Sequence, residues 1–125
     1  MHILHIEDNV FKHRDICNIL QTCGNVDIAW AKNLEEGIEM IQRSVEASRQ
    51  YDIIITDMYY PLVRGGNETK AGELLIQKIR EMGLVIPVIL CSSADIRMQG
   101  ILGTVHYSER EDWESELRRL VKSQM

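Results

Sequence analysis

The sequence predicts an α/β fold in which one doubly wound, five-stranded parallel sheet lies between two layers of helices. One observation is the stretch from Tyr51 to Pro61, a β-branched apolar run that ends in the carboxylate of Asp57 and is stopped by a proline. An apolar run bounded by a turn signal is typical of a strand buried on both faces of a parallel sheet. A second observation is that such strands alternate with segments of helical periodicity, which indicates right-handed crossovers.

The N-terminal half predicts two strand and helix pairs. Asn9 is a natural capping residue, and Asn33 begins a near capping box that ends at Glu36. The predicted strands are residues 2 to 6 and 26 to 30. A helix over residues 10 to 22 has Val10, Ile16, Ile19 and Leu20 as its apolar positions, and the helix after Asn33 has an inner stripe of Leu34, Ile38, Ile41 and Val45.

The C-terminal half continues the alternation with one long loop. Residues 62 to 71 are polar and contain glycine, and loops of that length are often functional. Further elements are expected as a helix over residues 72 to 82 with Leu74, Leu75 and Ile79 inward, a strand over 86 to 91, at most one or two helical turns over 94 to 100, a weaker strand over 101 to 107, and a helix over 113 to 122.

Composition limits the class of protein. The 125 residues, 45% of them apolar, form one domain over residues 1–125. A net charge of -5 and the lack of any Lys/Arg cluster argue against nucleic-acid binding. No apolar stretch is long enough for a membrane span or a signal peptide, so we expect a soluble, cytoplasmic protein. Cys17, Cys23 and Cys91 lack ligand spacing and are expected to be small apolar residues in a reducing compartment.

Acidic residues stand at the ends of two predicted strands. Glu7 and Asp8 follow the first strand, and Asp57 follows the third. Ligands of open α/β sheets bind outside the carboxyl ends of the strands, so the three carboxylates converge if these strands are neighbours. Clustered carboxylates repel one another, and a hard divalent cation with oxygen ligands relieves that repulsion. The sequence therefore predicts a Mg²⁺ site that leaves positions for a phosphoryl group.

These motifs resemble the receiver domains of bacterial response regulators, the CheY-like superfamily. The run from Ile3 to Asp8 is similar to the family's first strand with its acidic pair, and Asp57 followed by Pro61 is similar to the phosphoacceptor motif. The run from Pro87 to Ser92 is similar to the fourth strand, which ends in Ser or Thr. The resemblance covers most of the chain, and it implies a flavodoxin-like three-layer sandwich with strand order 2-1-3-4-5.

The resemblance also implies a function in phosphorelay, or two-component, signal transduction. Asp57 would accept a phosphoryl group from a histidine kinase or phosphotransfer protein, and Ser92 would donate a hydrogen bond to that group. Glu7, Asp8, Asp57 and the backbone carbonyl of Tyr59 would bind Mg²⁺. We expect a stand-alone receiver that signals through a downstream protein partner. We expect no enzymatic activity beyond self-phosphorylation and autodephosphorylation. The sequence does not decide between a monomer and a homodimer.

One departure from the family pattern concerns a cation. Receivers carry a lysine after the fifth strand, but Tyr107 stands at that position, and Thr104 stands where a switch aromatic is common. Loss of the lysine removes a charge-assisted contact to a phosphoryl dianion. One hypothesis is that Lys70 or Arg64, on the long loop beside Asp57, replaces the charge.

Other interpretations remain beside this one. The acids at the strand ends also suit a helix start or a turn, and Ser92 suits a turn. The missing lysine favours, as the second function, a phosphorylation-independent interaction domain that keeps the fold. A third is a Mg²⁺-dependent phosphohydrolase with Asp57 as nucleophile, which is disfavoured because Tyr59 stands where such enzymes have a general acid.

Overall fold

A five-stranded parallel sheet in the order β2-β1-β3-β6-β7 forms the centre of the molecule. This is the predicted 2-1-3-4-5 order, because β6 and β7 are the fourth and fifth strands of the sheet. The computed structural model describes all residues, 1–125. Its elements in chain order are β1 (His2–Ile6), α1 (Val10–Gln21), β2 (Asp27–Ala31), α2 (Leu34–Glu46), β3 (Ile53–Thr56), β4 (Tyr60–Pro61), β5 (Glu68–Thr69), α3 (Ala71–Glu81), β6 (Val88–Ser92), β7 (Gly103–His106) and α4 (Trp113–Lys122).

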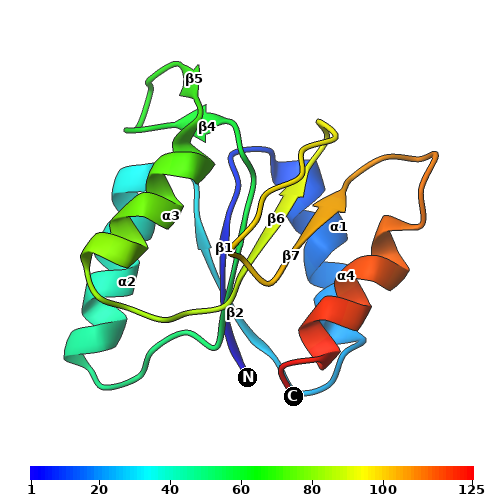
Figure 1. The fold of residues 1–125 in the computed structure, drawn as a ribbon, viewed down its shortest axis with the longest axis horizontal. Helices are drawn as coiled ribbons and strands as arrows, with labels where there is room; N and C mark the ends of the chain where they lie inside the picture. The colour runs from blue at the N-terminus through cyan, green and yellow to red at the C-terminus, as the bar shows by residue number, and fades with distance from the viewer.

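Two helices cover each face of the sheet. In Figure 1, α2 and α3 lie on one side of the strands, and α1 and α4 lie on the other. Successive residues of a strand point to opposite faces, so Ile54 packs in the core under α2 and α3, while Ile53 and Ile55 pack in the core under α1 and α4. All three isoleucines have no exposed surface, as expected for a strand buried on both faces. The three-layer prediction is confirmed.

Helices α1 and α2 begin where their capping residues predict, but the buried positions of α1 are not all apolar. Asn9 and Asn33 accept hydrogen bonds from the N–H groups of Lys12 and Glu36. On α1 the buried positions are Lys12, Ile16 and Leu20, whereas Val10 is exposed. These positions recur every four residues, so the lysine lies on the same inward face as two core residues. Val10, one of the apolar positions of this helix, therefore does not lie on its buried face.

Helix α3 is rotated relative to the prediction. Leu75 and Ile79 are buried as expected, but Ile76 takes the third core position, and Leu74 is exposed beside Leu62 and Val63 of the preceding loop. That loop is not irregular throughout, because Tyr60–Pro61 and Glu68–Thr69 pair as a short antiparallel ribbon. The ribbon holds the loop at the carboxyl edge of the sheet.

No helix connects β6 to β7. Residues 93 to 102 form bends and irregular backbone, although the chain must return the full length of the sheet between these parallel strands. Met98 and Ile101 of this segment pack against the core under α2 and α3. In Figure 1 this connection is accordingly drawn as a loop without a helical turn.

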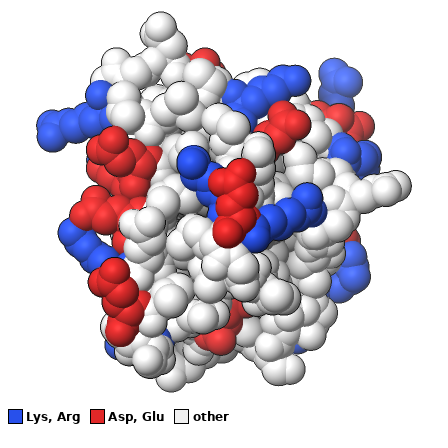
Figure 2. Space-filling model, turned by 60° about the vertical axis from the view of Figure 1, so that its left-hand side comes forward, with Lys and Arg blue, Asp and Glu red and all other residues white.

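The surface carries mixed charge. On the face shown in Figure 2, Lys and Arg side chains alternate with Asp and Glu, and no continuous basic stripe is present. No helix in the structure is both long and apolar enough to cross a lipid bilayer.

Candidate metal centre

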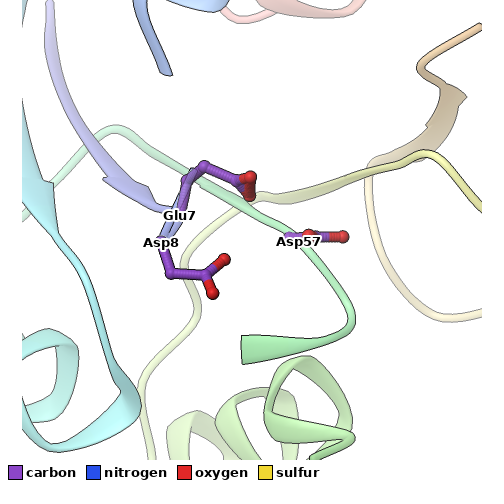
Figure 3. Close-up of side chains that lie close together, drawn as sticks. All are labelled: Glu7, Asp8 and Asp57. Atoms are coloured by element: carbon purple, nitrogen blue, oxygen red, sulfur yellow. The ribbon is translucent and has the colours of Figure 1, made fainter. Parts of the chain in front are cut away.

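Three carboxylates meet at one edge of the sheet. Glu7 and Asp8 directly follow β1, and Asp57 directly follows β3. Strands β1 and β3 pair in parallel with Ile6 opposite Thr56, so their carboxyl ends lie side by side. One ligand oxygen from each of the three residues lies within 4.8 Å of the others. Figure 3 shows these side chains gathered at the ends of the two strands.

Backbone hydrogen bonds fix the acids in place. The Glu7 N–H donates to the Ala31 carbonyl at 3.0 Å, and the Asp57 N–H donates to the Ile6 carbonyl at 3.2 Å. The indole N–H of Trp30 donates to the Glu7 carbonyl at 2.8 Å. The Met58 N–H donates to Asp57 Oδ1 at 2.7 Å. The sheet and its neighbours therefore set both strand ends before any ligand binds.

Glu7 is held in an environment that opposes its charge. Its side chain is 1% exposed, and burial raises its pKa to about 8. The positive charge of Lys12 lowers the pKa, whereas the negative charges of Asp57 and Asp8 raise it. Glu7 Oε2 has no hydrogen-bond partner. A buried carboxylate oxygen that accepts no hydrogen bond, next to two more carboxylates, suits Mg²⁺, which prefers oxygen ligands. The residues present therefore fit the ion.

A buried lysine faces the same carboxylates. The Lys12 ammonium lies 3.4 Å from Glu7 Oε2 and 3.4 Å from Asp57 Oδ2. It donates a hydrogen bond to the Cys91 carbonyl at the end of β6, at 2.8 Å. The centroid of the Tyr107 ring lies 5.4 Å from the nitrogen. Three oxygens and an aromatic ring thus surround the buried ammonium group of Lys12.

Sequence reasoning missed Lys12. Neither Lys70 nor Arg64 forms an ion pair with Asp57, and both side chains are exposed. The available signal was the four-residue spacing of Lys12 with Ile16 and Leu20. A lysine in register with two core positions must bury its stem, and it then needs an anionic partner near the helix start.

Gly72 permits α3 to begin directly beside Asp57. A Cβ at this position would lie 2.4 Å from the Asp57 carbonyl oxygen and 2.9 Å from the Met58 Cα. The Gly72 N–H donates to the Met58 carbonyl at 3.0 Å. Only glycine fits so close a backbone approach, so this residue sets the distance between α3 and the acid loop.

The remaining predicted residues lie at the end of β6, within and directly after β7, and in the loop after β3. Ser92 is 2% exposed, and its hydroxyl oxygen accepts a hydrogen bond from the Ala94 N–H. Tyr107 follows β7 and donates its hydroxyl hydrogen to Asp15 Oδ2 of α1 at 2.5 Å. Thr104, within β7, accepts a hydrogen bond from Arg97 at 3.4 Å. Tyr59 lies two residues after Asp57 with its side chain partly exposed.

A stack of three aromatic rings stands beside the acids. His13 stacks on Trp30 with ring centroids 3.9 Å apart, and on His5 at 4.9 Å. The two histidines face each other through their Nδ1 atoms at 2.7 Å. Burial, followed by the charges of His13 and Lys12, lowers the pKa of His5; burial, followed by the charge of Lys32, lowers the pKa of His13. Both rings therefore favour the neutral form.

Comparisons with known proteins point to one fold. No protein family model matches the chain. Two-component system protein A of the fungus Emericella nidulans is 33% identical over 90 residues, which cover 70% of this chain and 11% of that protein. The chain thus spans about a tenth of the length of this relative. The relative is fungal, so the bacterial setting suggested by the resemblance is not confirmed.

Two solved structures extend the similarity over nearly the whole chain. The receiver domain of the response regulator NarL from Mycobacterium tuberculosis superposes with a TM-score of 0.72 at 18% identity, covering 98% of this chain and 93% of that one. The Mn²⁺-bound form of response regulator Rcp1 gives a TM-score of 0.69 at 17% identity, covering 98% of this chain and 89% of that one.

Proposed function

Because this chain has the CheY-like fold of response regulator receiver domains, we propose that it acts as a receiver in two-component signalling, with Asp57 as the phosphoacceptor and Mg²⁺ as the cofactor. The observation that carries the proposal is the convergence of Glu7, Asp8 and Asp57 within 4.8 Å at the carboxyl edge of the sheet. The phosphoryl donor would be a histidine kinase or phosphotransfer protein. The output would pass to a protein partner, because the net charge of -5 disfavours nucleic-acid binding.

Phosphoryl transfer to Asp57 is a displacement at phosphorus. A carboxylate oxygen of Asp57 attacks the phosphorus of the donor's phosphohistidine, the new O–P bond forms, and the N–P bond breaks with its electron pair on the imidazole nitrogen. Such transfers depend mainly on positioning and on charge stabilisation. Met58 positions the carboxylate through its N–H group, and Lys12 supplies positive charge 3.4 Å from Oδ2.

The proposed metal ligands are the side chains of Glu7, Asp8 and Asp57 and the backbone carbonyl of Tyr59. When bound there, Mg²⁺ would offset the charge of the three carboxylates and of the phosphoryl oxygens. Ser92, buried at the end of β6, is proposed to donate its hydroxyl hydrogen to a phosphoryl oxygen. Its oxygen accepts a hydrogen bond from the Ala94 N–H, and its hydrogen is still free to be donated.

The test is phosphorylation by a small-molecule donor. Incubation with acetyl phosphate and Mg²⁺, followed by intact-protein mass spectrometry, should add the mass of one phosphoryl group. Asp57→Asn should abolish the addition, and the exposed Asp52→Asn should not, since the Asp52 side chain accepts a hydrogen bond from the His2 N–H at the amino end of β3, away from Asp57. Folded wild-type protein that gains no mass from acetyl phosphate or from a phosphorylated histidine phosphotransfer protein would contradict the proposal.

One observation favours a second function, a phosphorylation-independent interaction domain. Lys12 places a cation that belongs to the chain itself 3.4 Å from both Glu7 Oε2 and Asp57 Oδ2. A cation that belongs to the chain can hold the acids together permanently, so that the conformation does not change with phosphorylation. If this function is correct, the wild-type protein will gain no phosphoryl group and its unfolding temperature will not respond to Mg²⁺, although Asp57 is intact.

A further inference from the structure

The most unusual group near the acids is the ammonium of Lys12. Its side chain is 7% exposed, which is rare for a lysine, because removing an ammonium from water costs several kcal/mol unless it is paired and hydrogen-bonded. The three oxygens that offset this cost come from three different elements: Glu7 after β1, Asp57 after β3 and Cys91 on β6. Lys12 is therefore held at the point where the strand ends converge.

The position of Lys12 is fixed from its own helix. Its backbone N–H donates to the Oδ1 of the capping residue Asn9 at 3.0 Å. Ile16 and Leu20, on the same face of α1, have no exposed surface and lie in the core with residues of β3. The side chain thus starts from an anchored backbone and does not sample the surface.

We propose that Lys12 binds the phosphoryl group carried by Asp57, so that the cation of this receiver comes from helix α1 and not from the segment after β7. This inference rests on the proposed function. The Lys12 nitrogen already faces Asp57 Oδ2 at 3.4 Å. A phosphoryl group attached to that carboxylate adds a dianion to the same space, and the ammonium is the nearest cation to it. Tyr107 cannot supply charge and instead lays its ring beside the lysine.

The contacts of Tyr107 indicate which face of the molecule would respond. Its hydroxyl donates to Asp15, which lies on α1 three residues after Lys12. Its ring packs against Trp113 at the start of α4, with centroids 4.9 Å apart. A shift of the Lys12 side chain from Glu7 toward a phosphoryl group therefore changes the surroundings of a tyrosine that touches both α1 and α4.

A charge-relocation experiment tests the proposal. Beryllofluoride mimics a phosphoryl group on aspartate, and its binding in the presence of Mg²⁺ is measured by calorimetry for the full chain. Lys12→Met should weaken binding by about 10- to 100-fold, the loss typical of one charge-assisted hydrogen bond to an anion. Lys122→Met, which removes an exposed lysine of α4, should bind as the wild type does. The double variant Lys12→Met/Tyr107→Lys should recover most of the affinity, because a lysine at 107 starts beside the vacated space.

Two further outcomes distinguish failure of the Lys12 inference from failure of the proposed function. If Lys12→Met binds beryllofluoride within about threefold of the wild type, Lys12 is only structural and the inference is overturned. If the wild type itself neither binds beryllofluoride nor gains a phosphoryl group, the proposed function fails first. A measurement on the wild type covers the case in which the variants do not fold. In a protein labelled with ¹³C at lysine Cε, the Lys12 signal, assigned with Lys12→Arg, should shift on adding beryllofluoride and Mg²⁺, and an unmoved signal would overturn the inference.

Discussion

The site has two halves that are built in different ways. The acid half consists of Glu7, Asp8 and Asp57, which follow adjacent strands and are fixed by the register of the sheet. The cation half consists of Lys12 with the Cys91 carbonyl and the Tyr107 ring, and it depends on a long side chain that reaches in from a helix. The difference teaches that strand topology alone places the acid half, whereas the cation half depends on how α1 packs against the sheet.

The largest expected effect breaks the frame of the acid half. Gly72→Ala places a Cβ where the Asp57 carbonyl and the Met58 backbone lie, so α3 must move away from the acid loop. We expect a loss of about 2–4 kcal/mol in the free energy of unfolding, measured by urea denaturation. A loss under about 0.5 kcal/mol would show that the close approach of α3 does not constrain the acids.

A second test breaks the cation half. Lys12→Met leaves Glu7 and Asp57 without their buried partner, and we expect a loss of about 1–3 kcal/mol in unfolding free energy. The double variant Lys12→Met/Glu7→Gln should recover part of this loss, because a neutral amide replaces the buried acid that has lost the cation beside it. Lys122→Met, at an exposed lysine, is the matched control and should change stability by less than about 0.5 kcal/mol. Strictly additive losses in the double variant would contradict a Lys12 to Glu7 coupling.

A third, smaller effect tests whether the Tyr107 hydroxyl contributes to the cation half. Tyr107→Phe keeps the ring beside Lys12 but removes the hydrogen bond from the hydroxyl to Asp15. We expect a loss of about 0.5–1.5 kcal/mol by urea denaturation, the usual value of one hydrogen bond. Beryllofluoride affinity should stay near the wild-type value. A large loss of that affinity would mean that the tyrosine hydroxyl, and not the lysine, governs the cation half.

The smallest effect concerns pH. The pKa of His13 is lowered in the folded state from its ordinary value of 6.5, mainly by burial. Below about pH 6.5 the unfolded chain therefore binds a proton that the folded chain resists, and stability falls as pH drops. In urea denaturation at a series of pH values, His13→Gln should show a shallower fall than the wild type below pH 6.5. Parallel curves for the two proteins would contradict the assignment.

The acid half could be predicted because its causes are local and periodic. A β-branched run ending in Asp57, and a strand with Ile3, Leu4 and Ile6 ending in Glu7 and Asp8, identify strands whose carboxyl ends share one edge, and the crossover rule supplies the direction. Asn9 and Asn33 identified helix starts for the same local reason. The resemblance then added the strand order, which the register of β1 with β3 confirms.

The cation half could not be predicted in this way, because helix rotation depends on tertiary packing. Counting apolar residues grouped Val10 with the apolar positions of α1 and assigned Leu74 to the inner face of α3, whereas packing turns both outward. It also passed over Lys12, since a charged residue scores as exposed. The hypothesis that Lys70 or Arg64 supplies the cation is limited in the same way. Both residues are near Asp57 in sequence, but neither forms an ion pair with it.

The most direct test of the account is calorimetric titration of the protein with Mg²⁺ before and after the substitution Asp57→Ala. If Glu7, Asp8 and Asp57 together form a divalent cation site, the wild type will take up one ion and the variant will lose that uptake. No uptake by the folded wild type, or the same uptake by both proteins, would contradict it.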